Sequence, residues 1–469
     1  MHLASWYVKS FQFIWGKRIL LFKILITIGV VFAALISGWI ANRSETAFNL
    51  ALAGCIILLA GVIFYRGGRY ENGIVMVMLA AGLVNFFTLP TGTQSRIVVS
   101  LLLSVVLIGL WILQLLTDKQ TKLISTPIQK PILAFISVSI LAYFWSLVAR
   151  DPLLVVWESF PMVQLAALAV NILLPLMALF VANHIKEIAW LKRLAWTIIG
   201  LGIIVCLGNI LDLPIYRMYF NGSRGLFVTW SAGIAYAMAL FDDRLSKFTR
   251  LALLGLVALT VYWTFIIEAF WLSGWLPLGV TCVVITFFRS RKLFAFLCVI
   301  GLIYVGIHFD SLYQRIVIAN INEGSNARLE LWQRNFDLAL KHPLLGVGPA
   351  GYAIYYMTYH PEAARSTHNN YFDILSQTGF IGLGVFLWMF AVFIYLAFSL
   401  RRKLAGTHTF EEAYANAGLG GCCGALAAMM LGDWVLPFAY NQTITGFDNA
   451  VFTWIFLGGI AGLYYLVNK

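Results

Sequence analysis

Charged residues are scarce in this chain. Asp, Glu, Lys and Arg make up 11% of its 469 residues, while 61% are hydrophobic and 15% are aromatic. A soluble domain carries about 25% charged and about 45–50% apolar residues. The composition therefore excludes an ordinary soluble domain, and the mean hydropathy of +0.86 predicts a polytopic membrane protein instead.

Cysteine is also scarce, and its placement excludes two kinds of site. All six cysteines fall inside apolar stretches, and none has the spacing of metal ligands: they are Cys55, Cys206, Cys282, Cys298, Cys422 and Cys423. We interpret them as small buried hydrophobes rather than as disulfide partners or zinc ligands. No internal repeat, low-complexity tract or soluble domain stands out along the chain.

Long apolar windows are what the chain has in abundance. A membrane-spanning helix needs about 20 predominantly apolar residues. Fourteen windows are candidates: 19–41, 46–65, 73–89, 95–117, 131–149, 161–183, 191–211, 224–241, 251–267, 269–288, 293–309, 379–400, 414–432 and 449–467. We interpret the first as an uncleaved helix rather than a signal peptide, because further spans follow it at once. The predicted fold is all-α, with about 12–14 transmembrane helices.

The distribution of basic residues predicts an orientation. Lysine and arginine near membrane spans remain on the cytoplasmic side, and with the N-terminus inside, most of the 32 basic residues fall in inner turns. The clusters at 244–250 and 289–292 both belong inside, so two spans must separate them, with a break near Glu268. We attribute the net charge of +12 to orientation and to contact with anionic membrane lipids, and predict no nucleic-acid partner.

One long polar connection divides the chain into three parts: an N-terminal transmembrane bundle over 1–309, an outer loop over 310–378 and three C-terminal spans over 379–469. Loops this long are uncommon unless they are functional. Within it, ARLELWQRNFDLALK predicts a helix with an apolar stripe at Leu329, Trp332, Phe336 and Leu340. The glycine-rich stretch LLGVGPAGY predicts a tight turn, and Thr367 is expected to cap a second helix that begins at His368.

The loop carries a family resemblance. RLELWQRNFDLALKHPLLGVGPAGY, followed by HNNYFDILSQTGFIGLGVF, resembles the signature of the O-antigen ligase and O-antigen polymerase superfamily. The resemblance implies a GT-C-like membrane glycosyltransferase of the bacterial cytoplasmic membrane, with its active site facing outside. Such an enzyme passes a glycan from undecaprenyl diphosphate to a hydroxyl on a glycan or lipid acceptor, without a metal or other cofactor. It also implies a functional histidine in the HN element, here His368, and arginines that bind the diphosphate, here Arg328 and Arg224.

The residue chemistry supports the same roles. A departing diphosphate is an anion whose charge must be balanced, and the acidic residues on the outer side contain no Asp-x-Asp pair to hold a divalent cation. The planar, permanently charged arginine side chain suits phosphate. Histidine, with an ordinary pKa near 6.5, suits the removal of a proton from an acceptor hydroxyl at neutral pH. Asn369, Asn370 and Asp373 are candidates to orient the imidazole or to hold sugar hydroxyls.

One departure from the family pattern widens the list of candidate arginines. Many members have a Ser-Arg pair between the spans before the long loop, whereas this chain has EAFWLSGWLPLGV there and no arginine between Arg250 and Arg289. Arg217 and Arg365 are therefore further candidates for the diphosphate site. Glu268 and Asp433, at outer ends of predicted spans, are candidate acceptor contacts.

The sequence leaves three functions open. A ligase and a polymerase differ in their acceptor, and the loop motif does not separate them. A transporter or flippase would also have many spans, although transporters tend to show internal repeats and charges at the membrane midplane, whereas the notable polar residues here gather in the outer loop. A membrane scaffold is a third alternative, but it would require neither the histidine nor the arginines.

Overall fold

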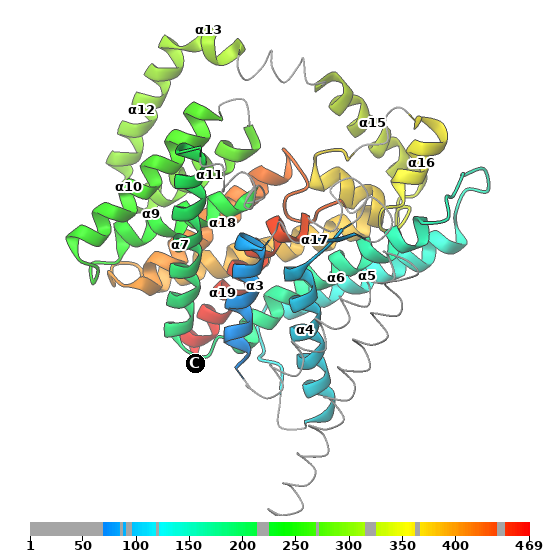
Figure 1. The fold of residues 1–469 in the computed structure, drawn as a ribbon, viewed down its shortest axis with the longest axis horizontal. Coiled ribbons are helices and arrows are strands. Elements are labelled where there is room, and N and C mark those ends of the chain that lie inside the picture. Colours follow the sequence, from blue (N-terminus) through cyan, green and yellow to red (C-terminus); the bar gives the residue numbers. More distant parts are fainter. Residues whose placement is uncertain are drawn as a thin grey trace, which may run out of the picture.

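The structure is a computed structural model that describes residues 69–84, 88–90, 96–118, 122–212, 225–268, 272–314, 325–361, 366–438 and 446–469. These residues are mostly helical (Figure 1). The one strand pair among them is a short antiparallel hairpin of β1 (Thr88–Pro90) and β2 (Arg96–Val98), which precedes a long helix.

The α-helices are labelled in Figure 1. Their bounds are α3 (Tyr70–Leu83), α4 (Val99–Thr117), α5 (Gln129–Val148), α6 (Phe160–His184), α7 (Ile188–Ile210), α9 (Leu226–Phe241), α10 (Lys247–Val261), the π-helical turn η1 (Tyr262–Ile267), α11 (Leu272–Arg289), α12 (Arg291–Ile307), α13 (Phe309–Leu312), α15 (Ser325–Lys341), α16 (Tyr352–Tyr359), α17 (Asn370–Leu404), α18 (Phe410–Met429) and α19 (Gly446–Asn468).

The predicted windows correspond closely to these helices. Each window from 73–89 onward contains one helix, and η1 ends immediately before Glu268, where the charge pattern predicted a break. Among the described residues, eight helices are long and apolar enough to cross a membrane, namely α4, α5, α6, α7, α10 with η1, α11, α17 and α19. Windows 19–41 and 46–65 lie outside the described residues. The predicted all-α, polytopic membrane fold is confirmed.

The centre of the bundle is built from helices with small residues. α18 packs against α9, α11 and α17, and a Cβ atom added at Gly424 would lie 2.3 Å from Thr281 Oγ1, while one at Gly421 would lie 2.4 Å from the Trp230 ring. Glycine at these positions allows close approach between helices, a common device in membrane bundles. In contrast, α12 has no buried residue, so its apolar surface faces outward from the bundle.

A break in α17 joins the membrane bundle to the long loop. Gly379 has φ 69° and ψ −172°, so the α-helical ladder is interrupted there. The carbonyls of Ser376 and Gln377 accept instead from the backbone N–H groups of Val347 and Gly348, at 2.9 and 3.0 Å. The Phe380 N–H donates to the Pro343 carbonyl at 2.8 Å. The glycine-rich turn therefore replaces the hydrogen bonds that the break removes from α17.

We expect Gly379→Ala to destabilise the protein. The backbone conformation at Gly379 is one that only glycine adopts readily, and a Cβ atom there would lie 2.3 Å from the Leu344 carbonyl oxygen. The strain alone costs about 1–3 kcal/mol, which thermal unfolding in detergent would measure as a lower Tm. Gly384→Ala is the matched control on the same helix, because its added methyl meets nothing within 4 Å. An equal Tm for the two variants would contradict the role given to the break.

Candidate functional site

The HN element forms the turn that leads into α17. The helix begins at Asn370 and is capped by Asn369, whose Oδ1 accepts from the Tyr371 N–H at 3.0 Å. The predicted start at His368 with Thr367 as the cap is therefore wrong. The reason is the backbone of His368, whose φ of 51° lies in the left-handed region. A residue in that conformation cannot belong to a right-handed helix, so α17 cannot begin before it.

His368 is half-buried and held in this turn by its neighbours. Its backbone N–H donates to Ser366 Oγ at 3.0 Å. Thr367 Oγ1 accepts from the Asn369 N–H at 3.2 Å and lies 2.6 Å from Asp373 Oδ1. These hydrogen bonds hold the backbone of His368 in place against a group of polar side chains.

The polar side chains that pack against the turn form a buried cluster. Asp373 is 1% exposed and accepts from the Tyr352 hydroxyl at 2.6 Å. Asn370 is fully buried, and its amide group donates to the Leu436 carbonyl at 2.7 Å and accepts from the Val435 N–H at 3.0 Å. Asn370 therefore fastens the start of α17 to the segment between α18 and α19.

Asp433 lies in that segment and belongs to the same cluster. It is fully buried, and its Oδ2 accepts from the Phe438 N–H at 2.9 Å. Burial raises the pKa of Asp433 to about 6, while hydrogen bonds from the Phe438 N–H and the Ser366 hydroxyl act in the opposite direction. Asp433 and Asp373 lie near enough to repel each other when both are ionised. A pair of neighbouring buried carboxyls under a polar turn is typical of functional sites.

The loop helix α15 reaches the same turn. Trp332 Nε1 donates to the Thr367 carbonyl at 2.8 Å, and its ring stacks on Phe372 with centroids 5.5 Å apart. Arg328 precedes Trp332 by four residues and so lies on the same face of the helix. Arg328 is half-buried and has no hydrogen-bond or ion-pair partner among the described residues.

The apolar stripe predicted for this helix does not form its buried face. Leu329, Phe336 and Leu340 are exposed, whereas Leu331 and Ala339 are buried. A chain that lies beside a membrane is not required to turn its most apolar face toward the protein. The stripe marks an outward surface of α15, and Trp332 is the member of the predicted set that packs inward.

The other predicted site residues fall into two groups. Arg217, Arg224 and Arg365 lie outside the described residues. Glu268 follows the π-helical turn η1, and its backbone N–H donates to the Trp263 carbonyl at 3.0 Å. Among the described residues, no hydrogen bond or ion pair joins Glu268 to the cluster around Asp373.

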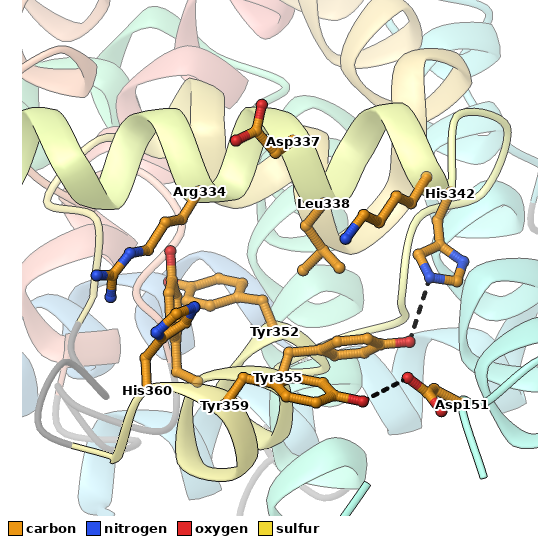
Figure 2. Close-up of a pocket in the computed structure, with 11 residues that line it drawn as sticks. Asp151, Arg334, Asp337, Leu338, His342, Tyr352, Tyr355, Tyr359 and His360 are labelled. Atoms are coloured by element: carbon orange, nitrogen blue, oxygen red, sulfur yellow. Dashed lines mark hydrogen bonds between the residues drawn. The ribbon is translucent and has the colours of Figure 1, made fainter. Parts of the chain in front are cut away.

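Sequence reasoning missed residues that the structure brings to this region. Ser366 and Tyr352 hold the turn and Asp373, and Tyr352 also belongs to a set of four tyrosines on α16 that lines a neighbouring pocket (Figure 2). The signal was present in YAIYYMTY, where tyrosines recur at positions 352, 355, 356 and 359, the spacing of one helical face.

A comparison with known protein families covers the region that contains this site. A family model described as O-antigen ligase matches residues 210–387, which include α15, the glycine-rich turn and His368. No curated protein matches the chain. The family consists of membrane glycosyltransferases of the O-antigen ligase and polymerase type. This match over residues 210–387, together with the membrane helices, supports the O-antigen ligase and O-antigen polymerase superfamily for this chain.

Proposed function

We propose that this protein transfers a glycan from undecaprenyl diphosphate to an acceptor hydroxyl, as an O-antigen ligase-like enzyme at the outer face of the bacterial cytoplasmic membrane. The single observation that carries the proposal is the hydrogen bond from Trp332 to the Thr367 carbonyl. It holds the helix of Arg328 against the turn of His368, although 35 positions of the sequence separate the two bonded residues.

The proposed reaction needs one proton acceptor and one cationic anion site. The acceptor oxygen attacks the anomeric carbon, a new C–O bond forms, and the bond from that carbon to the diphosphate oxygen breaks. The hydroxyl proton passes to the His368 imidazole. Undecaprenyl diphosphate leaves as an anion, and Arg328 faces its developing charge. No metal is part of this scheme, and Arg217, Arg224 and Arg365 remain further proposed members of the anion site.

The other site residues are proposed to act through the turn. Asn369 caps α17, the buried Asn370 makes its hydrogen bonds within the protein, and Oδ1 of the buried Asp373 accepts from Thr367 and Tyr352. Their place beneath His368 fits a positioning role better than direct contact with sugar hydroxyls. Asp433 is proposed to support the same turn through its hydrogen bond with the Ser366 hydroxyl. Glu268 is retained as a proposed acceptor contact only.

A transfer assay tests the function directly. Purified full-length protein in liposomes, with EDTA present, is given an undecaprenyl-diphosphate-linked oligosaccharide and two acceptors, a lipid A core and a second lipid-linked repeat. Transfer to the lipid A core would identify a ligase, and growth of the lipid-linked chain a polymerase. Wild-type protein that transfers glycan to neither acceptor would overturn the proposal.

Arg328→Ala is expected to reduce transfer by about 10- to 100-fold, because a hydrogen bond to a charged group contributes about 1.5–3 kcal/mol. Arg328→Lys should retain part of the activity, since it keeps the charge but loses the planar fork. Initial rates in the same assay measure both. Arg402→Ala, at the opposite end of α17 from His368, is the control. Equal rates for the two alanine variants would remove Arg328 from the anion site.

A further inference from the structure

A pocket of about 520 Å³ lies between α15 and α16, beside the proposed transfer site. Figure 2 shows α15 along one side, α16 along the other, and Asp151, from the connection between α5 and α6, at one end. Its volume is within the range of about 300–1,000 Å³ that is usual for ligand pockets. The reaction at His368 does not use these residues.

The wall formed by α16 is aromatic. Tyr352, Tyr355, Tyr356 and Tyr359 all line the pocket, and their spacing places them on one face of the helix. Tyr352 and Tyr356 are buried, at 0% and 4% exposed, and form the back of the wall, whereas Tyr355 and Tyr359 keep part of their surface accessible. A tyrosine offers a flat apolar ring together with a polar hydroxyl. A sugar presents the complementary surface, with C–H groups on the faces of its ring and hydroxyls around the edge.

Polar partners of the tyrosines are fixed in place. The Tyr359 hydroxyl donates to Asp151 Oδ2 at 2.7 Å, and the Tyr355 hydroxyl lies 3.2 Å from His342 Nε2 (Figure 2). Hydrogen bonds from the Leu153 N–H and the Tyr359 hydroxyl lower the pKa of Asp151, so it is ionised at neutral pH. Burial lowers the pKa of His342, which keeps its imidazole uncharged. These groups give fixed acceptors and donors for sugar hydroxyls.

The charge of the lining favours an uncharged ligand. Arg334 and Lys341 are balanced by Asp151 and Asp337, and Arg334 is already paired with Glu330 on its own helix. The pocket therefore has no excess positive charge to attract an acidic glycan. An aromatic wall with balanced charges is chemically suited to neutral sugars.

The pocket is also mechanically connected to the transfer site. Tyr352 lines it and donates its hydroxyl to Asp373, beneath the His368 turn. α15 contributes Arg334 to the pocket and Trp332 to the turn. From this arrangement we infer that the pocket binds neutral sugar units of the glycan beyond the reacting sugar, an inference that rests on the proposed function.

A binding measurement tests the pocket separately from catalysis. Full-length protein in lipid nanodiscs, which avoid competition from maltoside detergents, is titrated with fluorescently labelled neutral tri- and tetrasaccharides of glucose, galactose, mannose and N-acetylglucosamine, and with labelled trigalacturonic acid. Fluorescence polarisation should detect at least one neutral oligosaccharide. Tyr359→Ala is expected to weaken this binding at least about fivefold, as truncation of a central aromatic contact does. Tyr359 is 46% exposed, so its removal spares the core.

The control is Tyr313→Ala, which removes a similarly exposed tyrosine, 43% exposed, that does not line the pocket. The inference is overturned if no neutral oligosaccharide binds, if Tyr359→Ala binds like the control, or if trigalacturonic acid binds more tightly than every neutral glycan. In the transfer assay, Tyr359→Ala should raise KM for a donor with several sugars and leave kcat unchanged. Binding without transfer by the wild type would uphold the pocket and overturn the proposed function, and transfer without binding would do the reverse.

Discussion

His368→Asn should reduce glycan transfer by about 10²- to 10⁴-fold, the range that a general acid–base group contributes. Asparagine is the most informative replacement because His368 has φ 51°, a left-handed conformation that asparagine adopts more readily than most other residues. The variant keeps the backbone of the turn and a hydrogen-bonding side chain, but it cannot accept the proton of the acceptor hydroxyl. Initial rates under saturating donor, with the Tm measured in parallel, would give the effect on chemistry alone.

His408 provides a matched control for this measurement. It is a second histidine with a left-handed backbone, φ 53°, and it lies after the other end of α17, paired with Asp243. His408→Asn makes the same chemical change at a place with no proposed role in transfer, so its rate should equal that of the wild type. If His368→Asn retained most of the activity, the imidazole would orient a substrate by hydrogen bonding, and another group would accept the proton.

The fold was largely predictable because a bilayer imposes a strong pattern on sequence. An apolar run of about 20 residues has few alternatives to a spanning helix, so each window from 73–89 onward contains a helix. Helix packing was less predictable. α18 lies at the centre of the bundle although it carries Glu411 and Glu412 and is not among the eight candidate spans. Its glycines and alanines fit against α9 and α11, a relation that no single helix reveals.

The site was predictable as a list of residues but not as an arrangement. The motif placed His368 and Arg328 in one loop, and α15 does contact the His368 turn through Trp332. The break at Gly379 was not foreseen, because its partners, the N–H groups of Val347 and Gly348, come from an earlier part of the loop. The left-handed backbone at His368 was missed for a similar reason, since a histidine beside asparagines also fits a helix start. Contacts between segments determined both outcomes.

Asp433→Asn should stabilise the protein at pH 8. Burial raises the pKa of Asp433 from 3.8 to about 6. A carboxyl whose pKa is raised by folding contributes stability that is fully present below pH 3.8 and is lost as the pH rises through about 6. A difference of about two pH units corresponds to a free energy on the order of 3 kcal/mol. Asparagine can still accept from the Phe438 N–H and carries no charge beside Asp373.

The pH dependence of this gain separates a buried charge from a simple change in packing. The Tm of Asp433→Asn in detergent should exceed that of the wild type at pH 8, and the difference should shrink as the pH falls through about 6 towards 3.8, because Asp433 then becomes protonated in the folded state. Asp243→Asn, which removes a carboxyl with 46% of its side chain exposed, should show no comparable gain at pH 8. An Asp433→Asn variant less stable than the wild type at pH 8 would mean that its hydrogen bonds outweigh the cost of the charge. The stabilising result would instead mean that the protein retains a costly carboxyl beneath the His368 turn, as expected of a group kept for positioning the site rather than for stability.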